Sequence, residues 1–595
     1  MEAVTRKLDF VLTGDTADLR AATAQRESLR RKNEQDRTGL VERVAYTWFN
    51  RFAALRFIDA RGWHPFRARV LTAANADETQ PELLKLVRTG ALPAELTAHT
   101  QPNRLNDLLD GRIPSPDAQG EVYRHLVLAT CRFYHALLPD LFEKLDDETE
   151  LLLPDDLLTA TSVAEGFRTE ISDADCAEVE ILGWLYQFYI SEKKDQVFAG
   201  LKKNQKITAE NIPAATQLFT PHWIVRYLVE NSLGRLWLLN RPASSLATKM
   251  DYYIAPVEAE TDFLRITRPE DIRICDPACG SGHMLTYAFD LLYAIYEEEG
   301  YEADTIPALI LTQNLTGVEI DDRAGALGAF ALAMKAAAKL GRRRFLRMEV
   351  KPDICVLQNV SFTEAEMQDV AAVVGKDLFT DELRETLGQF EQAKNFGSLI
   401  VPKLRDPAEA LRVVEARDFA GDLLLKDVQA RVVAVLRMAE ALSPKYHVVV
   451  ANPPYMGGKS MNPSLQVFAR SKFPDSKSDL FAMFMERTLE LSRAQGMMAM
   501  INMQAWMFLS SFEKLRNKLL SGSTLISMAH LGERGFDTIG GAVVSTTAFV
   551  FKNSLAKGYQ GSFARLVDGR NESEKSNMML AICSDSSHDN HFLSS

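Results

Sequence analysis

The stretch "ICDPACGSGHML", Ile274–Leu285, decides the fold predicted for this 595-residue chain. An apolar strand ends there, Asp276 follows it, and Gly280 to Gly282 lead into a helix with an apolar stripe. A glycine turn between a first strand and a first helix lets a ligand approach the backbone closely. Leu285 occupies the third glycine position of a dinucleotide fingerprint, and there is no Lys-Ser/Thr pair of a Walker loop. The stretch therefore predicts a ligand-binding turn that favours neither NAD nor a nucleoside triphosphate.

Over the whole chain, the pattern of apolar residues changes near residue 211. Residues 1–210 are mostly helical by pattern, whereas short apolar runs alternate with amphipathic helices afterwards, which is typical of a parallel sheet. We expect an α/β fold with a helical domain over 1–210, a Rossmann-like domain over 211–568 and a poorly ordered polar tail over 569–595. The predicted strands are "IRICD", "LTGVEID", "HVVVA", "MMAMIN", "LISMAHLG" and a terminal antiparallel strand in "GAVVSTTAFVFKN".

Composition narrows the class of protein. The six cysteines form no CxxC pair, and the first residues lack the apolar core of a signal peptide. These features predict a cytoplasmic protein without structural zinc and without a membrane segment. The net charge of −12 weighs mildly against a nucleic-acid partner, although an acidic protein can carry a basic cleft.

The pattern D-x-x-x-G-x-G in the opening stretch resembles motif I of S-adenosylmethionine-dependent methyltransferases. By that resemblance, Asp276 and the Gly280–Gly282 backbone hold the amino-acid portion of S-adenosyl-L-methionine. "TGVEIDD" ends the next strand in acids, and a carboxylate there can accept both ribose hydroxyl protons. Glu319 matches that position, with Asp321 as the alternative. The candidate cofactor residues are Thr220, Pro221, Asp276, Pro277, Ala278, Gly280, Gly282, Glu319 and Asp321.

Thr220 and Pro221 precede the glycine loop in "ATQLFTPHWIVRYLVENSLG". Thr is expected as the cap of a helix that Pro opens. "FTP" also resembles motif X of adenine-methylating enzymes, which closes over the methionine end of the cofactor. A reader of the cofactor adenine is expected in "DICVLQN", where Asp353 and Gln358 remain alternatives.

A second motif, "VVVANPPYMGG" at Val448–Gly458, places Asn452, Pro453, Pro454 and Tyr455 at the tip of a buried strand. Two prolines cannot continue a strand, so the chain must leave the sheet here. The exocyclic amine of adenine is a poor nucleophile, because its lone pair is drawn into the ring. The Asn452 carboxamide oxygen and the Pro453 carbonyl can each accept one of its N–H groups and direct the lone pair at a methyl group.

These four residues are the candidate catalytic residues. They can act on an adenine only if its amino group reaches the loop. A base within a duplex must flip out, and stacking on Tyr455 offsets part of that cost. In "INMQAWMFLSSFEKLR", Phe512 best matches an aromatic residue that packs edge-on against the flipped base, and a core position is an equal alternative. The expected partner is double-stranded DNA with a flipped adenine.

Several segments together resemble the PglX family, the adenine-specific DNA methyltransferases of BREX phage-defence systems in bacteria. The resemblance implies N6-adenine methylation at a non-palindromic site and cooperation with other BREX proteins. Proteins of that family are much longer and carry target recognition in a carboxy-terminal region, so we expect a truncated chain. The segments are "AYTWFNRFAALRFI", "DDETELLLPDDLL", "EILGWLYQFYISEKKD", "IPAATQLFTPHWIVRYLVENSLGR" and "DPACGSGHML".

Other functions remain open. A non-catalytic module that binds DNA or a partner would keep the fold without turnover. Enzymes that methylate glutamine side chains or RNA bases also use Asn-Pro-Pro-Tyr, but they usually lack the helical front and "FTP". "PDD" at 154–156 and "SEKK" at 191–194 loosely fit a metal-nuclease pattern on apparently helical segments. The sequence gives neither the recognition site nor the oligomeric state.

Overall fold

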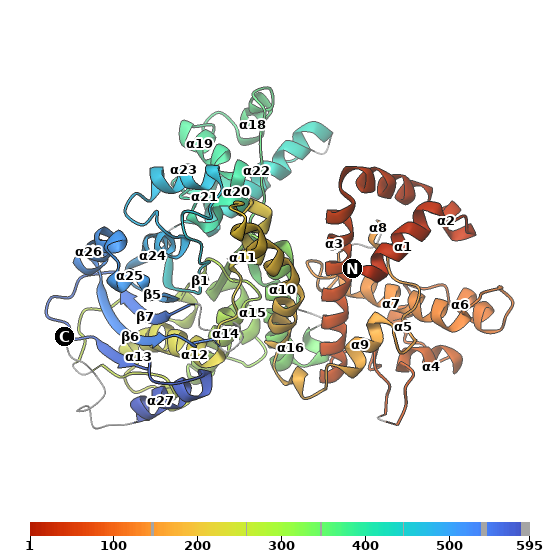
Figure 1. Cartoon of the computed structure of the whole chain (residues 1–595), viewed down its shortest axis with the longest axis horizontal. Coiled ribbons are helices and arrows are strands. Elements are labelled where there is room, and N and C mark those ends of the chain that lie inside the picture. The colour runs from red at the N-terminus through yellow and green to blue at the C-terminus, as the bar shows by residue number, and fades with distance from the viewer. Residues whose placement is uncertain are drawn as a thin grey trace. The chain divides into compact units, whose positions relative to one another are not determined.

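A computed structural model shows the chain as two compact units (Figure 1). Unit 1 comprises 1–186 and 333–349, and unit 2 comprises 187–332 and 350–595. The boundary therefore falls inside a helix near residue 186, and a later segment joins the amino-terminal unit, which the predicted boundary at 210 did not include. The structure describes all residues except 76, 144–147, 257–258, 346–347, 420, 444, 537–543 and 585–595.

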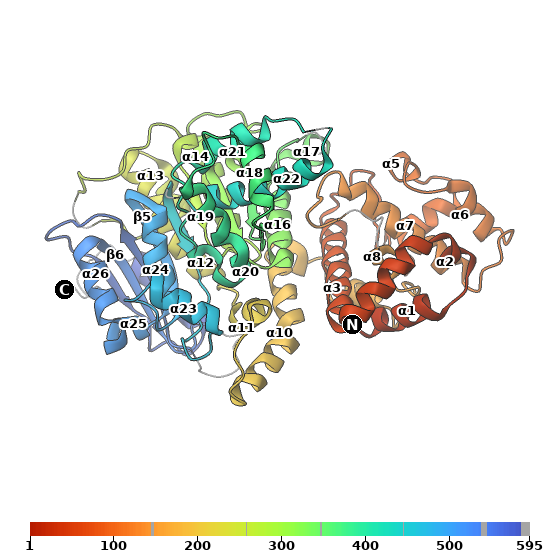
Figure 2. The same cartoon turned by 90° about the horizontal axis from the view of Figure 1, so that it is seen from above.

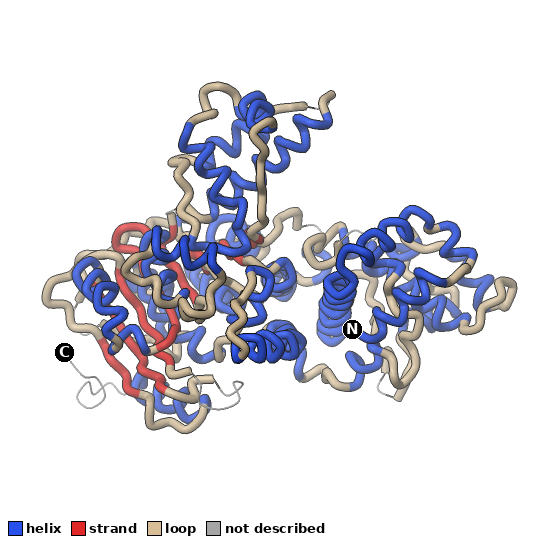
Figure 3. The backbone as a smooth tube through the Cα atoms, turned by 45° about the horizontal axis from the view of Figure 1, so that its top comes forward, coloured by secondary structure: helices blue, strands red, loops and turns tan. Residues whose placement is uncertain are grey.

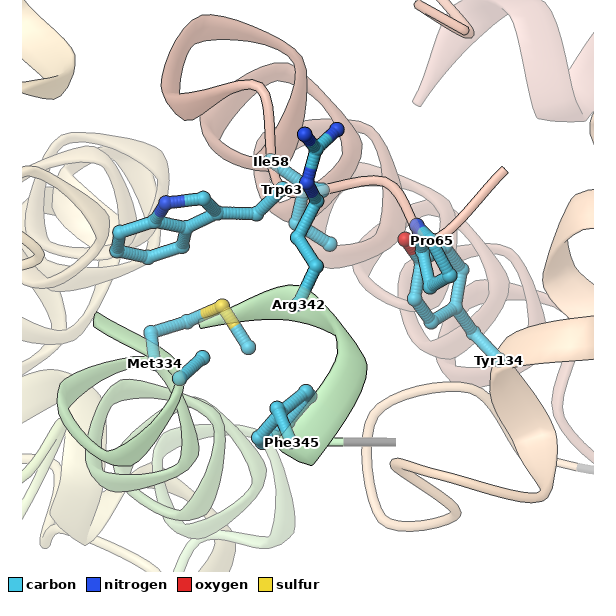
Figure 4. A pocket seen from close by; sticks show the side chains of 8 residues that line it. Ile58, Trp63, Pro65, Tyr134, Met334, Arg342 and Phe345 are labelled. Carbon is cyan, nitrogen blue, oxygen red and sulfur yellow. The ribbon is translucent and has the colours of Figure 1, made fainter. Parts of the chain in front are cut away.

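The regular secondary structure of unit 1 is helical, and no strand occurs among its described residues. Its longest helix, α3, buries an aromatic-rich face that includes Trp48, Phe52 and Phe57. A small pocket lies between the end of α3 and the 333–349 segment, lined in part by Trp63, Met334 and Arg342 (Figure 4). Its free volume, ≈ 10 Å³, holds about one water molecule, so it is not a ligand site as it stands. The helices are α1 (Glu2–Thr13), α2 (Ala17–Ala21), α3 (Thr23–Arg61), α4 (Glu82–Arg88), α5 (Ala94–Thr97), α6 (Pro102–Leu109), α7 (Ala118–His135), α8 (Glu148–Leu151), α9 (Val163–Thr169) and α17 (Arg342–Phe345).

The strands of the described chain lie in unit 2 (Figure 3) and form one eight-stranded sheet in the order β3-β2-β1-β4-β5-β7-β6-β8. Strand β7 runs antiparallel to β5 and β6, and every other described pair is parallel. The strands are β1 (Ile274–Asp276), β2 (Leu315–Glu319), β3 (Asp353–Val356), β4 (Tyr446–Ala451), β5 (Ser492–Met503), β6 (Thr524–Gly532), β7 (Thr546–Lys552) and β8 (Ser562–Arg565). The six strands named from the sequence are present, and β8 was not predicted. The first residues of "GAVVSTTAFVFKN" lie outside the described part of the chain.

Helices pack on both faces of this sheet (Figure 2). Val449 of β4 pairs with Met498 of β5, so their side chains share one face of the sheet. Two apolar clusters lie on this face, one that includes Val449 and α22 and another that includes Met498, α24 and α26. Helices α12 and α14 pack against each other and against the sheet. The remaining helices of unit 2 are α11 (Ile212–Thr216), α12 (His222–Val229), α13 (Arg235–Asn240), α14 (His283–Glu298), α15 (Ile306–Leu309), α18 (Glu366–Val374), α19 (Asp381–Gln389), α20 (Ala393–Phe396), α21 (Pro407–Glu415), α22 (Leu423–Ala441), α23 (Pro463–Lys472), α24 (Leu480–Leu491), α25 (Ala505–Phe508), α26 (Glu513–Gly522) and α27 (Glu572–Ser584). Two helices, α10 (Ile181–Lys202) and α16 (Asp322–Leu340), contribute residues to both units.

The tail differs in part from the expectation of disorder. Residues Glu572–Ser584 form α27, and Lys575, Met579 and Ile582 are buried. The Lys575 ammonium donates to the carbonyls of Leu531 and Leu566, so a polar residue fastens this helix to the sheet. The polar composition of this segment predicted disorder, because composition does not reveal the few long-range contacts that bury these three side chains. Residues 585–595 lie outside the described residues.

Candidate active site

The glycine loop after β1 contains a buried acid. Asp276 is the last residue of β1, and one of its carboxylate oxygens accepts a hydrogen bond from the Ala278 N–H at 3.0 Å. The other oxygen, Oδ2, is buried without a hydrogen-bond partner among the described residues. Burial, with a smaller contribution from the Glu319 charge, raises the pKa of Asp276 to about 8. The loop therefore holds an uncompensated acceptor, which suits a cationic or hydrogen-bond-donating ligand.

Glu319, at the end of β2, faces this loop. Its Oε2 accepts from the Gly280 N–H at 2.8 Å, and its Oε1 accepts from the N–H groups of Ile320 and Asp321. Burial raises the pKa of Glu319 to about 7, and the neighbouring Asp321 charge adds to the effect. Asp321 itself accepts from the Arg323 N–H at 3.0 Å. Of the two candidate acids, Glu319 is the one that contacts the glycine loop.

The loop after β4 leaves the sheet beside the glycine loop, because β1 and β4 are adjacent parallel strands. The Asn452 amide nitrogen donates to the Leu218 carbonyl at 3.1 Å and to the Thr220 hydroxyl at 2.9 Å. The Asn452 oxygen accepts from the Tyr455 hydroxyl at 2.9 Å. Burial raises the pKa of Tyr455, so the hydroxyl keeps its proton and remains a donor. Pro453 is buried, and Pro454 and Tyr455 are half-buried.

Thr220 contacts the Asn452–Tyr455 loop and does not cap a helix. Pro221 occupies the cap position of α12, and no side chain caps this helix, so the predicted Thr220 cap is wrong. The Thr220 side chain is instead directed at Asn452 and at His283, whose Nε2 lies 2.9 Å from the hydroxyl. Thr220 is fully buried. The hydroxyl therefore joins the loops after β1 and β4 rather than standing open to a ligand.

Asp353 and Gln358, the two alternatives for the residue that reads the cofactor adenine, lie toward opposite ends of β3. Asp353 is the first residue of β3 and accepts from the Thr316 hydroxyl, so it lies at the amino end of the strand. Gln358 lies beyond the carboxyl end, where the loops of the site begin, and donates to Asp322. In an open α/β sheet, ligands bind outside the carboxyl ends of the strands. This position favours Gln358 over Asp353.

Phe512 lies in the core. Its side chain is only 4% exposed and packs against Phe481 with a ring-centroid distance of 5.5 Å. Phe481 also lies edge-on to Tyr455, with a ring-centroid distance of 6.2 Å, so it contacts both of the rings that were expected to hold a base. The role of Phe512 at a flipped base stays a prediction. In this structure Phe512 packs against Phe481, which in turn contacts Tyr455.

Gly328 was missed by the sequence reasoning, although a glycine in the middle of a helix is a signal of close packing. A Cβ at Gly328 would lie 3.2 Å from the Gly280 carbonyl oxygen, and a Cβ at Gly282 would lie 3.1 Å from the Gly328 Cα. Gly282 also has a φ of +83°, which disfavours other residues. The glycine loop and α16 therefore touch backbone to backbone.

Gly328→Ala is expected to destabilise the chain and to weaken ligand binding at the loop by about tenfold. The helix propensity gain of about 1 kcal/mol is outweighed by overpacking costs of about 1–3 kcal/mol. Gly388→Ala is a matched control, because nothing lies within 4 Å of a Cβ there. Calorimetric unfolding and S-adenosylmethionine titration of both variants test this. Equal behaviour of the two alanines would contradict the close contact.

Asp479 was also missed. It caps α24 and accepts from the Met456 N–H at 2.9 Å, which fixes the end of the Asn452–Tyr455 loop. It is 9% exposed, and burial raises its pKa to about 6. A polar residue in the "KSDLF" segment downstream of the motif carried no recognisable signal on its own.

Asp479→Ala is expected to lower the unfolding free energy by about 1–3 kcal/mol, because it removes a helix cap and leaves the Met456 N–H unpaired. Asp479→Asn keeps an acceptor oxygen and is expected to lose less than half as much. Thermal unfolding of the two variants measures the difference. An asparagine variant as unstable as the alanine variant would show that the hydrogen bond to Met456 is not the cause.

Three further findings apply to the described residues alone. No group of three or more His, Cys, Asp or Glu side chains there could hold a metal ion. The two parts of the loose nuclease pattern lie in different units, and Asp155 is paired with Lys7. Among the same residues, every helix is too short or too polar to cross a bilayer.

The strand order, the single reversed strand β7 and the acid-ended strands β1 and β2 beside a glycine loop define the class I S-adenosylmethionine-dependent methyltransferase fold. The fold class expected from the sequence is confirmed. Residues 313–536 match the family model described as Eco57I restriction-modification methylase.

Curated relatives confirm the resemblance to the PglX family. The chain is 43% identical to the adenine-specific methyltransferase BrxX of Escherichia coli O9:H4 (strain HS), in an alignment 588 residues long that covers 93% of this chain. It is 36% identical over 91% of its length to the adenine-specific methyltransferase PglX of Lacticaseibacillus casei (strain Zhang). The chain spans about half the length of both relatives, 48% and 46%. A solved DrdV–DNA complex shows 12% identity and a TM-score of 0.42, over 92% of this chain and 46% of that one.

Proposed function

We propose that this chain is an adenine-specific DNA methyltransferase that transfers a methyl group from S-adenosylmethionine to N6 of adenine, in a bacterial phage-defence system of the BREX type. The single observation that carries the proposal is the position of Asn452 and Pro453 beside the Asp276–Gly282 loop, at neighbouring carboxyl ends of β1 and β4. The names of the relatives, both adenine-specific methyltransferases, support the substrate.

The residues present fit the cofactor. The unpartnered Asp276 oxygen would accept from the cofactor's amino group, and the Glu319 carboxylate would accept from ribose hydroxyls. Gly280 has a φ of +53°, which disfavours other residues, and no atom lies closer than 3.8 Å to a Cβ placed there, so the space beside the loop is open to a ligand. The cofactor supplies an electrophilic methyl group when bound. The pKa of about 8 at Asp276 implies that binding of a cationic group displaces a proton, so affinity should fall below pH 8.

The catalytic loop would act on the acceptor nitrogen. The Asn452 oxygen has two lone pairs, and one accepts from the Tyr455 hydroxyl. The other lone pair, together with the Pro453 carbonyl, would accept the two N–H groups of a flipped adenine. Both contacts strengthen as positive charge develops on the nitrogen, so they stabilise the transition state more than the ground state. The proton leaves after transfer, so no general base is required beforehand. Tyr455 would stack on the base.

Two experiments test the proposal. Isothermal titration with S-adenosylmethionine should show one site per chain, with proton release between pH 6 and pH 8. Long-read sequencing of DNA from a host that expresses only this chain should show N6-methyladenine at one recurring sequence. A folded chain that binds no cofactor would refute the methyltransferase function.

A second candidate is a non-catalytic module that binds DNA or other defence proteins. The match covers 48% and 46% of the curated relatives' own length, so their names describe proteins of which this chain matches only a part. Cofactor binding without any methylated DNA, in the same two experiments, would support this candidate.

A further inference from the structure

The orientation of the Asn452 carboxamide is fixed by groups on both sides. Its nitrogen faces two acceptors, the Leu218 carbonyl and the Thr220 hydroxyl oxygen, at 3.1 and 2.9 Å. Its oxygen faces a donor, the Tyr455 hydroxyl, at 2.9 Å. A rotated carboxamide would place oxygen against the Leu218 carbonyl and nitrogen against the Tyr455 donor. The two acceptors therefore hold the Asn452 oxygen on the side from which a substrate amine can be met.

The Thr220 hydroxyl can serve Asn452 only if its own proton has an acceptor. Thr220 is fully buried, so water does not satisfy it. Its hydroxyl contacts Asn452 Nδ2, which is always a donor, and His283 Nε2 at 2.9 Å. His283 Nε2 is thus the one acceptor for this proton among the described residues. With Nε2 as the acceptor, the proton of a neutral imidazole lies on Nδ1.

The position of His283 is itself fixed by the glycine loop after β1. It is the first residue of α14 and directly follows Gly282, and its ring packs on Phe219 with a centroid distance of 4.9 Å. A chain of hydrogen bonds thus runs from the start of α14 through Thr220 to Asn452. The loop after β1, which would hold the cofactor, and the loop after β4, which would hold the base, are joined by it.

We propose that His283 is a positioning residue that orients Asn452 through the Thr220 hydroxyl, and this inference rests on the proposed methyl transfer. In the structure His283 acts on the carboxamide only through Thr220. Removing its acceptor nitrogen leaves the buried Thr220 proton unpaired, and the hydroxyl must then turn toward another acceptor. A misplaced Asn452 oxygen weakens the contact with the developing positive charge, while the acids that would bind the cofactor are untouched.

The test uses two matched pairs of variants in the full chain. His283→Leu removes the acceptor and His283→Gln restores one, and Thr220→Val removes the hydroxyl and Thr220→Ser keeps it. We expect the leucine and valine variants to lose about 100-fold in single-turnover methyl transfer to DNA at saturating S-adenosylmethionine. The glutamine and serine variants should stay within about threefold to tenfold of the unmodified chain. The Kd of S-adenosylmethionine should change by less than about threefold in all four.

A double variant separates positioning from general damage. Thr220→Val with His283→Leu should be no slower than Thr220→Val alone, because His283 has then lost the group through which it acts. Multiplied losses would overturn the proposal, as would equal rates for the leucine and glutamine variants. If the leucine variant does not fold, the Thr220 pair still decides, since a valine variant as fast as the serine variant overturns it.

Nitrogen-15 NMR of histidine-labelled chain, with His283→Gln for assignment, provides a readout without turnover. An unprotonated Nε2 at His283, with a tautomer shift in Thr220→Val, supports the proposal, and a protonated Nε2 overturns it. Because this measurement needs no methyl transfer, it also distinguishes the two possible failures. The expected tautomer in a chain that methylates nothing refutes the proposed function alone, whereas active chain with the wrong tautomer refutes the positioning role alone.

Discussion

Asn452→Ala is expected to lower methyl transfer by about three orders of magnitude while leaving S-adenosylmethionine affinity within about threefold. Removal of one preorganised contact to developing charge costs roughly 10²–10³ in rate. In this chain the loss is larger, because the same side chain also satisfies the Leu218 carbonyl and the Thr220 hydroxyl oxygen. Truncation therefore removes the acceptor and loosens the loop that carries Pro453. Single-turnover transfer of labelled methyl groups to DNA, with parallel cofactor titration, measures both quantities.

Asn103→Ala is the matched control, because Asn103 is exposed in α6 of unit 1 and lies outside the site. It should leave rate and affinity unchanged. An Asn452→Ala variant that retains more than about a tenth of the rate would show that this carboxamide does not hold the substrate amine. Loss of cofactor binding in the same variant would instead point to collapse of the region around Thr220, which thermal unfolding would reveal.

The sequence predicted the parts of the site that depend on local chemistry. Asp276 ends β1, Gly280 follows it in the next turn, and Glu319 ends β2. They lie together in the structure because adjacent parallel strands bring their carboxyl ends to one edge of the sheet. The same argument placed Asn452 at the tip of β4. A hydrophobic run followed by Pro-Pro leaves little freedom in where the strand ends, so these positions were predictable from spacing.

Long-range pairing could not be predicted in the same way. The contact between Thr220 and Asn452 joins residues 232 positions apart, and no sequence pattern in either segment indicates that the two residues pair. Thr220 had a sufficient local explanation as a helix cap, which the structure rejects. Phe512 similarly fits two environments from sequence alone, and its burial depends on where Phe481 packs. The β8 strand was missed because four residues next to a polar tail give too short a pattern.

Asp276→Asn is expected to stabilise the ligand-free chain and to abolish cofactor binding. Burial raises the pKa of Asp276 from 3.8 to about 8, so the ionised carboxylate is disfavoured in the folded state. Between those two pH values the folded chain holds a proton that the unfolded chain releases, and stability therefore falls as pH rises through this window. The loss grows by about 1.4 kcal/mol per pH unit and reaches on the order of 5 kcal/mol above pH 8.

The asparagine variant has no such titration, so its stability advantage over the unmodified chain should widen from pH 6 to pH 8 and then stay constant. Other groups titrate in both proteins and cancel in the difference. Calorimetric unfolding at several pH values measures this. S-adenosylmethionine titration should show at least a 100-fold weaker Kd, since a neutral amide oxygen can accept a hydrogen bond from the cofactor's amino group but forms no ion pair with it. Asp107→Asn, at a half-buried acid of α6 paired with Arg112, is the control and should show no gain in stability that widens with pH.

If Asp276→Asn were no more stable than the unmodified chain at pH 8, the carboxylate would already be compensated in the folded chain, and the argument that this loop binds a cationic ligand would fail. A gain in stability together with lost binding would instead show that the fold retains a strained acid at the end of β1 for its ligand.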